Sequence, residues 1–149
     1  MAFRIEQHGP VAEVVLAHPP VNAFNSEQWN ELPGLITAAG KLPDTRCVLI
    51  RAEGKGFCAG VDIKEMQKHP ERIVQLNRGN FLTFKAIRAC EVPVVAAVHG
   101  FIIGGGIGIC GASDVVIAAG REASNVIRFH QAGTVSGWIE IDGVRHQVL

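Results

Sequence analysis

Short apolar runs alternate with longer segments of mixed polarity over most of this chain, and the runs have the length of β-strands. The first two runs flank His8-Gly9-Pro10, a turn-forming sequence, so we expect them to pair as a hairpin. Segments with helical spacing separate the later runs, which predicts an α/β fold with largely parallel strand pairing. The predicted strands are residues 3–7, 11–17, 46–52, 93–98 and 114–119.

Three segments between these runs have the pattern of helices. The first can be capped by Asn25 or Ser26. It contains Pro33, where we expect a kink or a break because an interior proline costs a helix about 3 kcal/mol. The second runs from Pro70 to about Cys90 and the third from about 105 to 112. The side chains expected to face the core are Trp29, Leu32, Leu35 and Ile36 in the first helix, and Ile73, Leu76, Phe81, Phe84 and Ile87 in the second.

The pattern changes beyond Gly120. Residues 121–131 show no clear period, whereas residues 138–146 alternate around Asp142-Gly143, a pair typical of two-residue hairpin turns. We therefore divide the chain into an α/β domain over residues 1–120 and a tail over residues 121–149 that forms an atypical C-terminal β-hairpin.

The composition narrows the classes of function. Apolar residues make up 48% of the 149 residues, which is enough for a packed core. Fourteen basic and fourteen acidic side chains balance and are scattered, so we expect no nucleic acid and no membrane as partner. The chain shows no signal peptide and no membrane-spanning run, which favours a cytoplasmic protein. Histidines without ligand spacing and cysteines without CxxC spacing predict no metal and reduced thiols.

Two glycine-containing segments, residues 56–62 and 100–106, carry the candidate chemistry. Each follows a predicted strand and leads into a polar or helical segment. Each is therefore a strand-to-helix turn, where unpaired backbone N–H groups lie near the positive end of a helix dipole. Two such turns side by side can hold one carbonyl oxygen that becomes negative during a reaction. The sequence thus predicts an acyl-transforming site built from backbone groups.

Residues 106–111 also match GxGxxG, the dinucleotide-binding pattern. These glycines begin eight residues after Val98 instead of at the strand end, and a new apolar run begins soon after them, at Asp114. No acidic residue ends a second strand at the distance that the dinucleotide fold requires. A nucleotide-dependent oxidoreductase is therefore a weaker interpretation.

Four ordered motifs resemble the crotonase (enoyl-CoA hydratase/isomerase) superfamily, and the resemblance covers about residues 3–119. The family implies a repeated ββα spiral, a coenzyme A thioester substrate with no permanently bound cofactor, and homotrimers or hexamers. The motifs are Pro20-Val21-Asn22-Ala23-Phe24-Asn25, residues 56–66, Pro93 to Gly100, and Gly104-Gly105-Gly106 followed by Ser113-Asp114.

The resemblance also implies roles for single residues. The two oxyanion donors of the family fall on the N–H groups of Val61 and Gly105. The loop from Val61 to Lys64, with Asp62 and Ile63, is expected to wrap the CoA. The Ala59 backbone is expected near the adenine, and Lys64 is a candidate for phosphate contact.

The chain departs from the hydratases of the family at both catalytic carboxylates. The glutamate that follows their glycine triplet corresponds to Gly108, and the second corresponds to Arg128. Gly108 and the segment 60–66 resemble an actinobacterial branch that hydrolyses a C–C bond in a steroid-ring CoA thioester. Three interpretations stay open: a hydratase or isomerase, such a C–C hydrolase, and a non-catalytic CoA-binding remnant. The tail after Gly120 suggests a truncated, frameshifted or fused gene.

Four further side chains near these turns have structural interpretations that we prefer. Asp62 suits the cap of the next helix better than a general acid or base. Glu65 is expected to face solvent. His99, at a strand end, is expected to be structural, and Cys58 is expected to pack, because no partnered histidine would activate its thiol.

Overall fold

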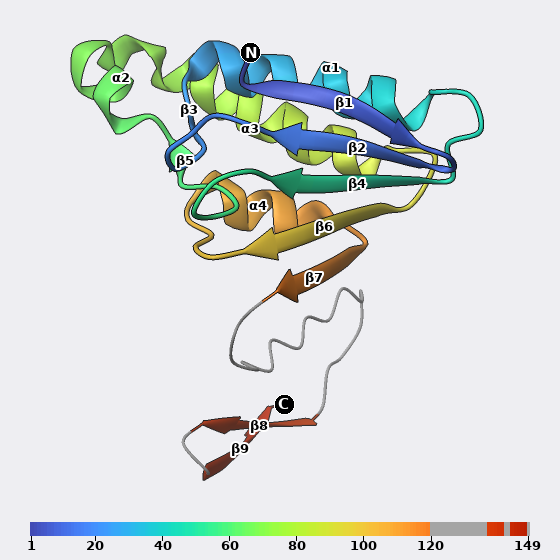
Figure 1. Ribbon diagram of the computed structural model, residues 1–149. Coiled ribbons are helices and arrows are strands. Elements are labelled where there is room, and N and C mark those ends of the chain that lie inside the picture. Colours follow the sequence, from blue (N-terminus) through green and yellow to red (C-terminus); the bar gives the residue numbers. More distant parts are fainter. Residues whose placement is uncertain (120–136, 142–143, 149) are drawn as a thin grey trace.

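The computed structural model describes residues 1–119, 137–141 and 144–148, and its main element is a twisted sheet (Figure 1). The first two strands form the predicted antiparallel hairpin, and each later strand of this sheet pairs in parallel with its neighbour. The strands lie in the order β1 (Phe3–His8), β2 (Val11–Leu16), β4 (Cys47–Ala52), β6 (Val94–His99) and β7 (Val115–Ala119).

Helices cover one face of this sheet (Figure 1). α1 (Ser26–Gly40) and α3 (Ile73–Arg88) pack against each other, and α4 (Gly105–Ala112) lies beside them. α2 (Ile63–Lys68) and a 3₁₀ turn, η1 (Pro70–Arg72), connect β5 to α3. The core between the sheet and the helices contains Val14, Leu16, Trp29, Leu32, Ile36, Val48, Ile50, Leu76, Ile87, Val94, Ala96 and Ile109, all almost or fully buried.

The chain repeats one structural unit, although its sequence shows no internal repeat. In each unit a strand of the main sheet is followed by a short second strand and then by a helix. The short strands pair in parallel: β3 (Ala23–Phe24) with β5 (Gly60–Val61), and Cys58 with Ile102 through an isolated bridge. This succession is the predicted ββα spiral. It places the N-termini of α1, α2 and α4 directly after the short strands.

Of the kink or break predicted at Pro33, the break does not occur, because α1 continues through this residue. Proline has no N–H to donate to the carbonyl four residues earlier, which is that of Trp29. The hydroxyl of Thr83 on α3 lies 3.3 Å from this Trp29 oxygen and 2.8 Å from Gly79 O. Its single hydrogen is shared between these two carbonyls, so the neighbouring helix compensates only in part for the missing donor. The predicted cap is confirmed, because Asn25 and Gln28 form a reciprocal capping box.

The predicted core face of α3 is partly wrong. Leu76 and Ile87 are buried, and Phe84 packs against the core, but Ile73 is 46% and Phe81 is 64% exposed. The buried stripe follows Leu76, Gly79, Thr83 and Ile87. Glycine and threonine occupy the two central positions because α1 approaches there: a Cβ on Gly79 would lie 2.8 Å from the carbonyl carbon of Trp29. A pattern of apolar residues does not identify such buried positions, because glycine and threonine occupy them.

The strands of the second predicted hairpin are present as β8 (Gly137–Ile141) and β9 (Val144–Val148), which pair antiparallel with Glu140 opposite Arg145. Its predicted turn, Asp142-Gly143, lies outside the described residues, and so do residues 120–136. The boundary near residue 120 remains a prediction. No helix in the described part of the chain has both the length and the apolarity needed to cross a bilayer.

The contact between Pro33 and Thr83 can be tested by a double-mutant cycle. Thr83→Val should lower the free energy of unfolding by about 1–2 kcal/mol, because it removes the donor to the Trp29 carbonyl. The same substitution should cost less in a Pro33→Ala background, where the alanine supplies its own N–H. Urea unfolding of the four proteins measures the coupling, and equal costs in both backgrounds would contradict the compensation.

Candidate active site

Backbone hydrogen bonds join the two predicted strand-to-helix turns. Phe57 N–H donates to the carbonyls of His99 and Phe101, at 3.0 Å each, and Ile103 N–H donates to Cys58 O at 2.9 Å. On the other side of the first turn, Ala59 N–H donates to Val21 O at 3.1 Å. Segments from all three structural units therefore lie side by side at the carboxyl end of the parallel strands (Figure 1).

Gly60 and Gly105 make the closest approach between these turns. A Cβ on Gly60 would lie 3.0 Å from Ile103 O and 3.2 Å from Gly105 N, and the φ of Gly60 is +88°. A Cβ on Gly105 would lie 2.5 Å from Trp29 Cζ2 and 2.6 Å from Asn80 Oδ1. A residue with a side chain fits neither position without displacing its neighbours. Gly60 is thus required for the two backbones to touch, and Gly105 for the close approach of the Trp29 and Asn80 side chains.

The amides of Val61 and Gly105, the predicted donors, are not used by the neighbouring backbone. Asp62 N–H donates to Phe24 O at 2.9 Å in the β3–β5 ladder, so the N–H of Val61, one residue earlier, points to the opposite side of the strand. Gly105 is the first residue of α4, and no acceptor among the described residues binds its N–H. Because Gly60 directly precedes Val61, the two amides belong to segments in contact.

The three helix starts at this end are closed in different ways. Asn25 caps α1 with its side chain, and Asp62 Oδ1 accepts from Lys64 N–H at 2.9 Å and from Glu65 N–H at 3.4 Å. This confirms the predicted capping role of Asp62. α4 begins after Gly104, which has no side chain to cap it. α4 is therefore the helix of the three whose positive end is not closed by its own N-cap residue.

The residues predicted to bind CoA surround this point. Val61 and Asp62 are half-buried, as is Ala59. Ile63 is 66% exposed and Lys64 is exposed, both in the first turn of α2. These side chains are accessible from solvent along one continuous segment.

Glu65 does not face solvent as predicted: its side chain is 9% exposed. Its carboxylate accepts from Ser26 N–H at 2.7 Å, from the Ser26 hydroxyl at 2.9 Å and from Arg72 at 2.9 Å. Burial alone would raise the pKa of Glu65, but the hydrogen bonds from Ser26 and Arg72 outweigh it and lower the pKa. The carboxylate also lies at the positive end of α1, so it ties α2 to α1.

Asn22 organises the first turn, a role that the sequence interpretation missed. It is fully buried with φ +53°. Its Nδ2 donates to Glu53 O at 2.7 Å and to Gly56 O at 3.1 Å, and its Oδ1 accepts from His18 N–H at 2.8 Å. Asparagine is among the few residues that adopt this backbone conformation, and an asparagine between two prolines and a predicted helix was the available signal.

Cys58 and His99 have the structural roles predicted for them. The Cys58 thiol is buried and accepts from Gly60 N–H at 3.3 Å, and burial raises its pKa to about 12, which leaves it unreactive. His99 Nε2 lies 3.0 Å from Gly54 O and so links the loops after β4 and β6. No disulfide joins the four cysteines.

Gly108, the position of the first missing glutamate, faces the ring of Phe84 on α3. A Cβ on Gly108 would lie 2.1 Å from Phe84 Cζ. A side chain at position 108 therefore requires Phe84 to move. Arg128, the position of the second missing glutamate, lies outside the described residues.

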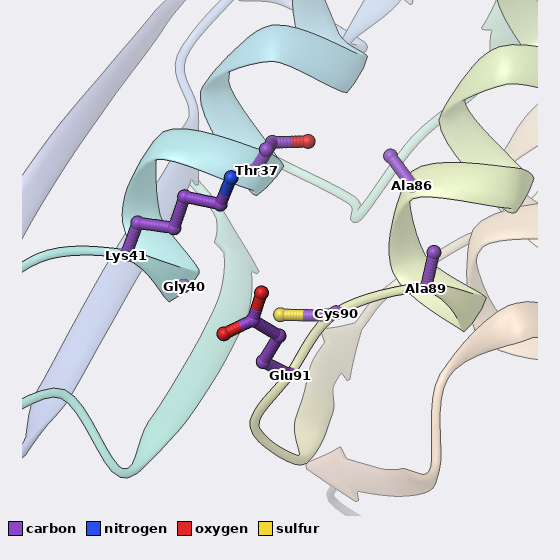
Figure 2. A pocket seen from close by; sticks show the side chains of 7 residues that line it. All are labelled: Thr37, Gly40, Lys41, Ala86, Ala89, Cys90 and Glu91. Atoms are coloured by element: carbon purple, nitrogen blue, oxygen red, sulfur yellow. The ribbon is translucent and has the colours of Figure 1, made fainter.

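One titratable cluster and one pocket lie away from this site. Glu6, His8 and Glu13 come within 4.8 Å of one another, but Arg4 and Arg51 pair with these carboxylates on the open face of the sheet. A pocket between the C-terminal ends of α1 and α3 is lined by Lys41, Cys90 and Glu91, among others (Figure 2). It lies at the opposite end of these helices from Gly105, and we assign it no role.

The approach of Gly60 to Gly105 can be tested by substitution. Gly60→Ala should lower the free energy of unfolding by about 1–3 kcal/mol, because alanine disfavours a positive φ and its Cβ meets the α4 backbone. Gly34→Ala is the matched control: Gly34 lies exposed in α1 with nothing near its Cβ position, and the change should stabilise by about 0.5–1 kcal/mol. Denaturant unfolding measures both, and a neutral Gly60→Ala would contradict the close approach.

The lowered pKa of Glu65 predicts a pH-dependent contribution to stability. Its ionised form is stabilised in the folded state, so this contribution is complete above the unfolded pKa of about 4.3 and is lost as pH falls through the lower folded value. Glu65→Gln should therefore destabilise the protein at neutral pH, and the difference from wild type should shrink in acid. The exposed Glu31→Gln should change stability little. A pH-independent difference for Glu65→Gln would contradict this assignment.

Sequence comparison identifies relatives of this chain. The profile of the Enoyl-CoA hydratase/isomerase family matches residues 6–148. The chain is 51% identical over 111 residues to the (7aS)-7a-methyl-1,5-dioxo-2,3,5,6,7,7a-hexahydro-1H-indene-carboxyl-CoA hydrolase of Mycobacterium tuberculosis, covering 73% of this chain and 45% of the relative. It is 50% identical to the hydrolase of the same name from Rhodococcus jostii, and the match covers 73% of this chain and 43% of the relative. It is 34% identical to a probable enoyl-CoA hydratase of Mycobacterium bovis, covering 77% and 45%.

Solved structures show the same fold. An enoyl-CoA hydratase/isomerase family protein from Hyphomonas neptunium superposes with a TM-score of 0.73 at 31% identity, over 79% of this chain and 47% of that one. An enoyl-CoA hydratase from Mycobacterium smegmatis superposes with a TM-score of 0.65 at 26% identity, over 80% of this chain and 47% of that one. The chain spans less than half the length of these relatives. Its profile, its fold and its ordered motifs together establish that it belongs to the enoyl-CoA hydratase/isomerase family, also called the crotonase superfamily.

Proposed function

We propose that the full-length protein processes an acyl-CoA thioester and stabilises its enolate through the backbone amides of Val61 and Gly105. The observation that carries this proposal is the contact between Gly60 and Gly105, which brings two amides with no backbone partner into adjoining segments. An enolate places its negative charge on the thioester oxygen. Fixed N–H donors stabilise that charge without reorganising, and losing one donor typically costs about 2.7–4 kcal/mol.

In this proposal CoA is part of the substrate, and no separate cofactor is required. Ala59, Val61, Asp62, Ile63 and Lys64 form the exposed edge beside the two amides, where CoA would lie. Lys64 provides a positive charge for a phosphate. Phe81, Ile103, Ile107 and Ile117 are each more than half exposed, and their burial between subunits would support the homotrimer or hexamer expected for the intact protein.

The sharper candidate is hydrolysis of a C–C bond in a steroid-derived ring carried on CoA. Identity is 51% to a ring-CoA hydrolase and 34% to a probable hydratase over similar lengths. In such a reaction the oxygen of water bonds to a ring ketone carbon, and the adjacent C–C bond breaks. Its electron pair forms the thioester enolate, whose carbon takes up the proton that the water gives up, and the ketone carbon becomes a carboxylic acid. The Phe84 ring over Gly108 gives this site an apolar wall where hydratases have a carboxylate.

A non-catalytic CoA-binding remnant is the second candidate. Gly108 carries no proton-transferring group, and Asp62 is engaged as a helix cap. This candidate predicts acyl-CoA binding without turnover. Parallel assays of crotonyl-CoA hydration and of cleavage of a cyclic β-diketone CoA ester, together with calorimetric binding, separate the three candidates.

The two amides can be removed singly without adding a side chain. Replacing Gly105 by glycolic acid, or Val61 by its α-hydroxy analogue, turns the N–H into an ester oxygen. Each change should lower turnover of the full-length protein by about 10²–10³-fold. The same replacement at Lys55, in the exposed loop after β4, is the control. Unchanged turnover in a Gly105 ester that retains its circular dichroism would refute the proposed role.

A further inference from the structure

Two side chains of α3 lie directly against glycines of α4. The oxygen Oδ1 of Asn80 lies 2.6 Å from the Cβ position of Gly105. One turn further along both helices, the ring of Phe84 lies at the Cβ position of Gly108. The other atoms nearest to these two positions are ring carbons of Trp29 and Phe84. Asn80 therefore places a polar atom among apolar ones, beside the residue whose amide the proposed function uses.

The hydrogen bond of Asn80 fixes which atom of its side-chain amide faces Gly105. Nδ2 donates to Leu76 O, one turn earlier in α3, at 3.1 Å. A carbonyl oxygen accepts and never donates, so the nitrogen must face Leu76 and the oxygen must face Gly105. No donor in the described part of the chain binds this oxygen. Asn80 Oδ1 is therefore an acceptor that the fold does not use.

This oxygen is also open to solvent. Among the side chains that the structure describes, the buried polar atoms without a partner are Trp29 Nε1 and Thr45 Oγ1. Asn80 Oδ1 has no partner and is not one of them, so it keeps accessible area. Asn80 and Gly105 are both half-buried. The acceptor is thus available to a ligand, in contrast to the fully buried indole N–H.

We infer that Asn80 Oδ1 accepts a hydrogen bond from a hydroxyl group on the third carbon of the acyl chain, counted from the thioester carbonyl. The inference rests on the proposed function and narrows its substrate class to acyl groups that carry a hydroxyl there or acquire one. A hydroxyl donates a hydrogen bond, whereas a ketone or an enolate oxygen accepts without donating. An acceptor next to Gly105 therefore favours the hydroxyl.

Both candidate reactions place a hydroxyl on this third carbon. Hydration of a conjugated thioester leaves the oxygen of water there as a hydroxyl. Addition of water to a ring ketone forms a hydroxyl on the same carbon before the C–C bond breaks. With the thioester oxygen on the Gly105 amide, this carbon lies two positions along the chain. A neutral amide takes up no proton, so Asn80 binds and orients the hydroxyl and does not act as a base.

Ligand preference tests this role on the full-length protein. By calorimetry, 3-hydroxybutyryl-CoA should bind about fivefold to tenfold more tightly than butyryl-CoA, the effect of one net hydrogen bond. Asn80→Leu, similar in size but without an acceptor, should weaken the hydroxylated ligand by that factor and leave butyryl-CoA unchanged. Asn80→Asp keeps an acceptor and should retain the preference. Asn80→Ala gives the same comparison if leucine disturbs the fold.

Asn77→Leu is the matched control, because Asn77 is exposed on the same helix and its side chain has no hydrogen bond among the described residues. It should keep the preference. A preference that survives Asn80→Leu would overturn the inference, and so would an equal loss of both ligands, which indicates a structural role. Equal affinity of the wild type for both ligands overturns the inference alone. Binding of neither overturns the proposed function as well.

Discussion

The contact between two strand-to-helix turns is the constraint on which the rest of this structure depends. Main-chain hydrogen bonds from Phe57 and Ile103 fasten the turn after β4 to the turn after β6, and Gly60 then touches the start of α4. Backbone groups make this contact, so its geometry is set by the spacing of parallel strands and not by side-chain rotamers. The same backbone contacts therefore fix the positions of the Val61 and Gly105 amides.

One helix end at this site is left open by its own cap residue, and the proposed function uses it. All three ββα units bring a helix N-terminus to the same end of the sheet. Asn25 closes α1 and Asp62 closes α2, but Gly104 cannot close α4. The same glycine-rich start lets Trp29 and Asn80 approach the α4 backbone. One local feature therefore provides both an available amide and room for polar neighbours.

Packing around α1 shows how tertiary contacts override local preference. Pro33 is unfavourable in an isolated helix, yet α1 continues through it, and Thr83 lies opposite the carbonyl that the proline leaves unpaired. Glu65 looks like a solvent-facing carboxylate in the sequence. Its side chain is instead held by Ser26, 39 positions away, and by Arg72. Ile73 and Phe81 are exposed because the face of α3 that meets α1 is chosen by small residues at Gly79 and Thr83.

Local sequence determined the strands of the main sheet, most helix bounds, the caps at Asn25 and Asp62 and the ordered motifs of the family, because each depends on residues close together in the chain. The approach of Gly60 to Gly105, the partners of Glu65, and the approach of Trp29 and Asn80 to Gly105 were decided by the tertiary structure. These contacts join residues tens of positions apart, and their distances follow from how helices pack on the sheet. No periodicity along one segment encodes such distances.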